Sequence, residues 1–198
     1  FGSGAGHATV ESAGPVSATI RVAVSGTLPR ETRVTLYRDL DRIDLDERIL
    51  DNFTGAAEYD SRIALPGRIV RHEEVGMIAR AARAAQGGDY ADQNARVDYL
   101  TFNHFVDFSD GARGVTISNG DSPYFRLGDS TPTVLDDASP VLRAVVGMQV
   151  DGPQLGIPAQ GGDRAFLDRF ALRTHGAWDP AAAMRMALEH QNPLIAAP

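Results

Sequence analysis

The sequence predicts a mostly β fold in which two antiparallel sheets pack face to face, with two short helices, as a single domain over residues 1–198. Three observations lead to this prediction. Apolar and polar residues alternate with a period of two in several segments, as in strands that bury one face. Clusters of Gly, Pro and Asp separate these segments. No shift in composition and no polar linker divides the chain.

The first predicted strand has the clearest pattern. Residues 16–24 alternate Val, Ala and Ile with Ser, Thr and Arg, and a turn follows at 26–29. A second strand is predicted to begin at Arg33 and to continue past Asp39 toward Leu45. Residues 67–74 are predicted to form the next strand.

The middle of the chain is less uniform. Residues 77–86 are rich in Ala and Arg and end at Gly87-Gly88, which favours a short helix or an ordered loop. Residues 98–108 alternate again, and aromatic residues on both faces indicate a central strand. Further strands are predicted at 114–118, 124–127, 141–150 and 165–174, which gives about nine in all.

The second predicted helix spans Asp179 to His190. Asp179 has the side chain of a good N-cap, and Pro180 suits the first helical position because its missing N–H has no partner there. Asn192-Pro193 ends the helix.

Composition excludes several classes of function. There is no cysteine, and all 19 basic residues are arginine, so thiolate chemistry, Schiff-base lysines and phosphate-loop lysines are excluded. A net charge of −7 argues against a nucleic-acid partner. No window approaches the roughly 20 apolar residues of a spanning helix, so we expect no membrane partner. Without a secretion signal, we expect a cytoplasmic location.

Two groups of polar residues could bind metal or act as acids and bases. Carboxylates crowd residues 38–51, but their spacing does not fit a calcium loop, and interspersed arginines favour a solvated strand face with ion pairs. No pair of histidines has metal-site spacing, so we expect no metal ligand. His104 or His175 with Glu74 is the only histidine–carboxylate pairing that could serve a sugar epimerase.

A carbohydrate-binding surface is predicted near the end of the chain. Arg169, Arg173 and His175 share one face of the predicted strand, and Trp178 follows closely. Planar donors beside an aromatic ring can hold sugar hydroxyls and stack on the sugar ring. The alternative is a solvated edge, with Trp178 packed under the helix.

The order of several motifs resembles a known family. The segment from Arg169 to Trp178, the helix and Asn192-Pro193-Leu194 are similar to the C-terminal β-sandwich region of glycoside hydrolase family 38, the α-mannosidases. Earlier landmarks follow the same order, and they include Arg42-Ile43-Asp44, Phe108-Ser109-Asp110 and Leu142-Arg143.

The resemblance implies a galactose-mutarotase-like supersandwich that follows a separate catalytic barrel. The aspartate nucleophile and the zinc ligands of the family belong to that barrel, and no segment here matches them. We therefore assign no catalytic residue, metal ligand or cofactor to this chain, and we expect zinc in a catalytic domain outside it. The chain is then expected to be a fragment of a larger glycoside hydrolase.

The predicted function is that of a non-catalytic domain of an α-mannosidase-like enzyme. Its expected partners are the catalytic domain of the same polypeptide and carbohydrate. Two alternatives remain open. One is a stand-alone, mutarotase-like epimerase, and the other is a carbohydrate-binding or assembly module that forms homo-oligomers.

Overall fold

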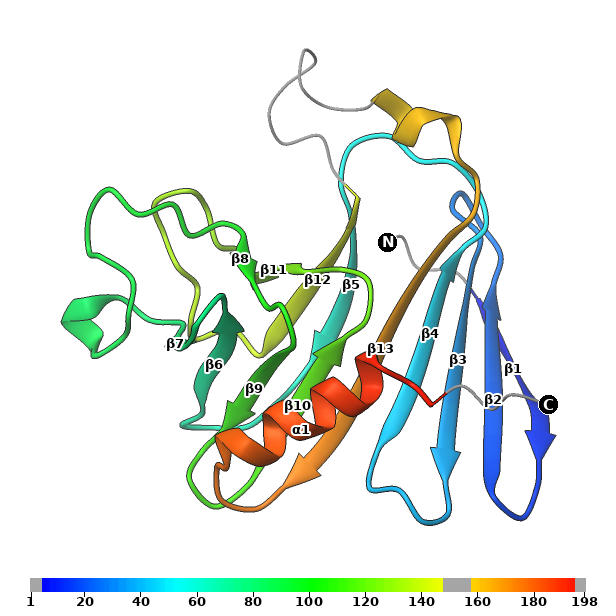
Figure 1. The fold of residues 1–198 in the computed structure, drawn as a ribbon. Coiled ribbons are helices and arrows are strands. Elements are labelled where there is room, and N and C mark those ends of the chain that lie inside the picture. Colours follow the sequence, from blue (N-terminus) through cyan, green and yellow to red (C-terminus); the bar gives the residue numbers. More distant parts are fainter. Residues whose placement is uncertain (1–4, 148–157, 195–198) are drawn as a thin grey trace.

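The computed structural model describes residues 5–147 and 158–194. Within these ranges it has thirteen strands in two antiparallel sheets, and one α-helix (Figure 1). The mostly β, two-sheet prediction is therefore confirmed. No helix within the described ranges is long and apolar enough to cross a membrane.

The two sheets differ in size. The large sheet has nine strands, in the spatial order β1 (Gly6–Ala13), β2 (Ser17–Val24), β3 (Arg30–Tyr37), β4 (Ile43–Ile49), β13 (Phe166–His175), β10 (Gly114–Asn119), β9 (Phe105–Ser109), β6 (Ile69–Glu74) and β7 (Met77–Arg80). The small sheet has the order β5 (Ala57–Arg62), β12 (Val141–Gly147), β11 (Tyr124–Leu127) and β8 (Leu100–Thr101). The α-helix is α1 (Pro180–Gln191), and 3-10 turns cover Ala84–Gln86 and Pro158–Gly162.

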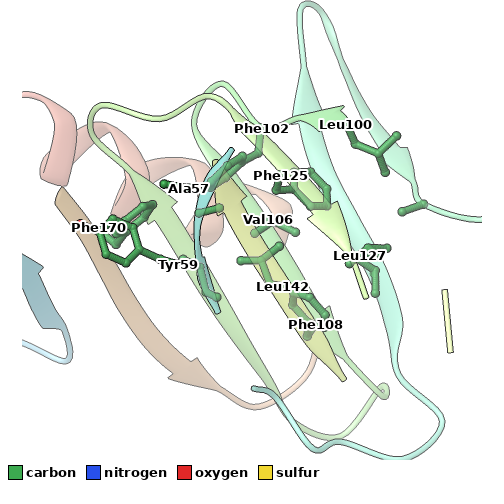
Figure 2. Packing of buried hydrophobic residues seen from close by; sticks show 14 of the residues in the cluster. Ala57, Tyr59, Leu100, Phe102, Val106, Phe108, Phe125, Leu127, Leu142 and Phe170 are labelled. Carbon is green, nitrogen blue, oxygen red and sulfur yellow. The ribbon is translucent and has the colours of Figure 1, made fainter. Parts of the chain in front are cut away.

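The core fills the space between the two sheets. Phe108 and Val106 from β9 face Phe125 and Leu127 from β11, and all four side chains are fully buried (Figure 2). The rings of Phe102 and Phe125 meet edge to face at 5.3 Å. Burial of these large apolar side chains is the main force that holds the sheets together.

Helix α1 packs on the other face of the large sheet, over β9, β10 and β13 (Figure 1). Its Ala183 and Ala187 bury against Phe105 of β9. Asp179 caps the helix by accepting hydrogen bonds from the backbone N–H groups of Ala181 and Ala182 at 2.9 and 3.1 Å. The predicted helix and its N-cap are confirmed.

Strands β1, β2 and β3 project past the small sheet and form what we call the wing (Figure 1). Cross-strand pairing places Val10 of β1, Ile20 of β2 and Val34 of β3 on one face. Val34 pairs in turn with Leu45 of β4, which packs against the core. The core-facing side of the large sheet thus continues as an apolar surface onto the wing.

Three sequence predictions were wrong in detail. The strand expected from Arg33 to Leu45 is a hairpin, because β3 ends at Tyr37 and β4 begins at Ile43 after an exposed turn. The strand expected at 98–108 is two strands, β8 in the small sheet and β9 in the large one. The chain crosses from one sheet to the other at residues 102–104. The alternation of apolar and polar residues continues through this crossing, so the pattern does not reveal that the partner strands change.

The predicted helix or ordered loop at 77–86 is also different. Met77–Arg80 is strand β7, paired with β6 across a turn in which Gly76 has φ of 85°. Only Ala84–Gln86 is helical, as a single 3-10 turn. Alanine favours a helix, but pairing with β6 and burial of Ala79 and Ala81 outweigh that propensity. Strands β1 and β5 were not predicted, and residues 148–150 of the predicted strand 141–150 lie outside the described residues.

Candidate functional site

The four residues of the predicted carbohydrate surface lie on β13 and just beyond it. Arg169, Arg173 and His175 alternate along β13 and therefore share the face that α1 partly covers. Arg173 contacts the helix directly, because its Nη1 lies 3.5 Å from the carbonyl oxygen of Ala182. The structure thus brings the predicted residues to one side of the sheet.

Arg169 is held by one carboxylate. Its Nε and Nη2 donate to the two oxygens of Asp121 at 2.9 and 2.8 Å, and its backbone N–H donates to the same carboxylate. The Arg169 guanidinium therefore holds the pKa of Asp121 below its ordinary value. Half of the Arg169 side chain remains exposed, so a ligand could still reach it.

His175 belongs to a buried hydrogen-bond network. Its Nε2 lies 2.7 Å from Oδ2 of Asp107, a fully buried residue of β9. The same carboxylate accepts hydrogen bonds from the hydroxyls of Ser109 and Thr116. Asp107 thus has three partners, which accounts for a carboxylate in the interior of the protein.

Trp178 completes this cluster. Its ring centre lies 6.3 Å from that of His175 and 5.9 Å from that of Phe105, and the Arg71 guanidinium lies 5.1 Å from the same ring. A cavity of about 210 Å³ lies beside the cluster, lined by Arg173, His175 and the start of α1. The half-buried Trp178 is therefore a packing residue as well as a candidate platform for a ligand.

The network does not have the geometry of nucleophilic catalysis. A serine nucleophile needs its hydroxyl bonded to a histidine base, which is itself oriented by a carboxylate. Here the Ser109 hydroxyl donates to the Asp107 carboxylate, and His175 contacts the same carboxylate from another side. The arrangement orients the His175 ring and leaves the serine without a base.

The histidine–glutamate pairing considered for an epimerase is not formed. His104 Nδ1 lies 2.7 Å from Glu73, whereas Glu74 accepts a hydrogen bond from Tyr90 at 2.8 Å. Glu73 and Glu74 are adjacent on β6, so their side chains point to opposite faces of the sheet. His175 contacts Asp107 instead.

Sequence reasoning missed two inward-facing carboxylates. Glu47 was assigned to a solvated strand face, but it lies between Leu45 and Ile49 on the core-facing side of β4. Asp168 of β13 is its direct cross-strand partner and is only 6% exposed. Burial raises the pKa of both carboxyls, that of Asp168 to about 7. The alternating pattern could have revealed Glu47, because it shares its face with Leu45 and Ile49.

Comparisons with solved structures identify the architecture. The chain matches an α-mannosidase from Enterococcus faecalis V583 with a TM-score of 0.71 and 13% identity, over 95% of this chain and 24% of that chain. It matches a glycosyl hydrolase family 38 protein from Enterococcus faecalis with a TM-score of 0.71 and 12% identity, over 95% of this chain and 25% of that one. No family model and no curated protein sequence matches the chain.

These matches establish a shared fold. The chain is an antiparallel two-sheet β-sandwich of the kind that occurs within α-mannosidase chains, so the predicted resemblance is confirmed at the level of the fold. It spans about a quarter of the length of the mannosidase chains that it matches.

Proposed function

We propose that this chain is the non-catalytic β-sandwich domain of an α-mannosidase-like glycoside hydrolase, with its catalytic domain elsewhere in the polypeptide. The observation that carries the proposal is the match of nearly the whole chain to about a quarter of a mannosidase chain. A domain that accounts for a quarter of an enzyme, and for which we identify no catalytic constellation among residues 5–147 and 158–194, fits an accessory role.

The chemistry of the described residues supports this role. Glycoside cleavage uses two carboxyl groups that flank the scissile bond from opposite sides. Glu47 and Asp168 lie side by side on neighbouring strands and point from the same face of the sheet. Both would therefore approach a sugar from the same side and could not flank its glycosidic bond. The proposal therefore places the nucleophile and the zinc ligands in the catalytic domain.

The wing supplies a surface for contact with that domain. On the core-facing side of the wing, Val10 is 70% exposed, Ile20 40% and Leu36 48%. The same face of the large sheet is buried only in the part that the small sheet covers. Contiguous exposed apolar surface marks sites of protein contact. We assign this face to packing against the catalytic domain; contact with a second copy of the chain is the alternative, which light scattering on the isolated chain would detect.

The proposal includes contact with carbohydrate at the α1 side of β13. The exposed half of Arg169 and the cavity beside Arg173 and His175 support it, and Trp178 offers an aromatic face nearby. If this surface contributes to sugar binding, Arg169→Ala weakens binding of mannose oligosaccharides by the parent enzyme while the variant keeps its fold.

The inactivity of the isolated chain can be tested directly. Purified chain is incubated with aryl α-D-mannosides with and without added Zn²⁺, and release of the aryl group is followed. We expect no turnover above a buffer control under either condition, because we assign no catalytic pair of carboxyl groups to the part of the chain that the structure describes. Turnover that is abolished by a substitution in this chain would overturn the proposal.

A further inference from the structure

A second cavity, of about 290 Å³, opens between the two sheets where the wing meets the sandwich. The large sheet contributes Arg30, Thr32 and Glu47 to its lining, and β5 of the small sheet contributes Tyr59. Its volume is at the lower end of the range of about 300–1,000 Å³ that is typical of ligand pockets. The cavity therefore suits a small compound of one ring.

One wall of the cavity is apolar. Leu45, Ile117 and Phe170 line it from three adjacent strands of the large sheet. The ring of Tyr59 meets that of Phe170 edge to face at 6.3 Å, and Figure 2 shows the two rings next to each other at the border of the core. This wall offers a firm apolar surface to the C–H groups of a ligand.

Another side of the cavity is polar, because of Glu47 and its neighbour Asp168. Glu47 lines the cavity and accepts a hydrogen bond from the Thr32 hydroxyl. Asp168 is the cross-strand partner of Glu47 and lies on the same face of β13 as Phe170. Its Oδ2 is buried and has no hydrogen-bond partner among the described residues.

An unsatisfied buried carboxyl oxygen has a physical cost. Burying a polar atom without a hydrogen bond is unfavourable, and most buried polar atoms in proteins have a partner. Directly opposed carboxyls on neighbouring strands also repel each other. Glu47 lines the cavity and Asp168 is its cross-strand partner, so a ligand whose hydroxyl groups bond Glu47 would lie close to both features and could relieve them.

The charges favour a neutral ligand. Burial raises the pKa of both carboxyls, that of Asp168 to about 7, so the pair carries less negative charge near neutral pH than two exposed carboxylates would. Arg30 adds one positive charge to the lining and interacts favourably with Glu47. Glu58 and Asp60 also line the cavity, and they are ion-paired with Arg126 and Arg143, respectively. The lining therefore carries little net charge and offers both donors and acceptors.

We propose that this cavity is a binding site for a neutral, polyhydroxylated ring compound of the size of a monosaccharide. The Asp168 and Glu47 carboxyls and the Arg30 guanidinium bond its hydroxyls, and the wall of Leu45, Ile117 and Phe170 packs against its C–H face. The site is separate from the α1 side of β13, and the proposal does not depend on the accessory role of the domain.

A divalent cation is the main competing occupant. Calcium takes six to eight oxygen ligands. Among residues 5–147 and 158–194, however, no three His, Asp or Glu side chains converge as a metal-binding group. Glu58 and Asp60 line the cavity besides Glu47, but both are ion-paired with arginines, so the structure favours the neutral compound.

The test is an NMR titration of the purified chain with labelled methyl groups. D-mannose, D-glucose and CaCl₂ are added in separate experiments, and the methyl resonances of Leu45 and Ile117 are compared with that of Leu188 in α1. We expect at least one monosaccharide to shift the Leu45 and Ile117 resonances saturably and to leave Leu188 unchanged. Shifts with CaCl₂ alone, or no saturable shift with either sugar, would overturn the proposal.

Variants locate the site. Glu47→Ala should weaken sugar binding roughly tenfold, because it removes hydrogen bonds to a charged group. Asp46→Ala is the matched control, since Asp46 is the neighbour of Glu47 on β4 but points to the opposite face, and binding should change less than about twofold. If Glu47→Ala does not fold, Glu47→Gln keeps the shape of the side chain and serves the same purpose. Equal losses in the Glu47 and Asp46 variants would contradict the assignment.

Discussion

Replacing Asp168 by Asn removes a carboxyl group whose burial strongly disfavours its charged form. Its folded-state pKa of about 7, against an ordinary value of 3.8, has burial as its largest cause, followed by the nearby charges of Asp121 and Glu47. The shift is about 3 units at about 1.4 kcal/mol each, so ionising this carboxyl in the folded protein costs roughly 4 kcal/mol as an upper limit.

The direction of the pH effect follows from the raised pKa of Asp168. Below pH 3.8 the carboxyl is protonated in both the folded and the unfolded chain, so its contribution does not vary. Between pH 3.8 and about 7 the unfolded chain releases the proton while the folded protein keeps it, and the free energy of unfolding falls as pH rises. Above about pH 7 this contribution is constant and unfavourable.

Urea denaturation at pH 5 and pH 8, followed by circular dichroism, measures the effect. Asp168→Asn should raise the free energy of unfolding at pH 8 by roughly 2–4 kcal/mol relative to the unmodified protein, and by less at pH 5. The control is Asp39→Asn, in the exposed β3–β4 turn, which should change stability little at either pH. An Asp168→Asn effect that is equal at both pH values would show that Asp168 does not keep its proton in the folded protein at pH 5 while the unfolded chain releases it.

Three further substitutions test the fold and the α1-side network, all by urea denaturation. Phe125→Ala should lower the free energy of unfolding by about 3–5 kcal/mol, because Phe125 is fully buried between the sheets, whereas Val75→Ala, at a residue 93% exposed, should have little effect. Asp107→Asn should lower the free energy of unfolding by about 3 kcal/mol, because at least one of the donors Ser109, Thr116 and His175 would then face an amide NH₂, which cannot accept its hydrogen bond. An unchanged stability would show that the network is not formed. Asp179→Ala should cost about 1 kcal/mol through loss of the α1 cap, and Asp137→Ala, in a loop, serves as its comparison.

The period-two pattern predicted the strands whose one face is buried under the small sheet or α1. β6, β10 and β13 were found for this reason, whereas β2 lies in the wing and was found because its alternating residues are partly buried. α1 was found from its capping residues. β1 was missed because every residue of it is exposed, so burial does not impose a strong apolar pattern. β7 was missed because its pairing with β6 overrides the helical propensity of alanine.

The candidate site was only partly predictable. The sequence placed Arg169, Arg173 and His175 on one face, since alternation fixes which residues of a strand point the same way. It could not show that Asp121 and Asp107, on other strands and loops, would hold two of them. The sequence also could not show that Glu47 and Asp168 are cross-strand partners. Their register depends on the hairpin within residues 33–45 and on the pairing of β4 with β13, which lies over a hundred residues later in the chain.

If this sandwich is one part of a larger glycoside hydrolase, the native polypeptide must be much longer than the sandwich. An antibody against the chain is used to isolate the polypeptide from the source cells, its mass is measured by mass spectrometry, and its α-mannosidase activity is assayed. We expect a polypeptide about four times as long as these 198 residues that cleaves aryl α-mannosides and contains zinc. A native polypeptide of about 198 residues without mannosidase activity would contradict it.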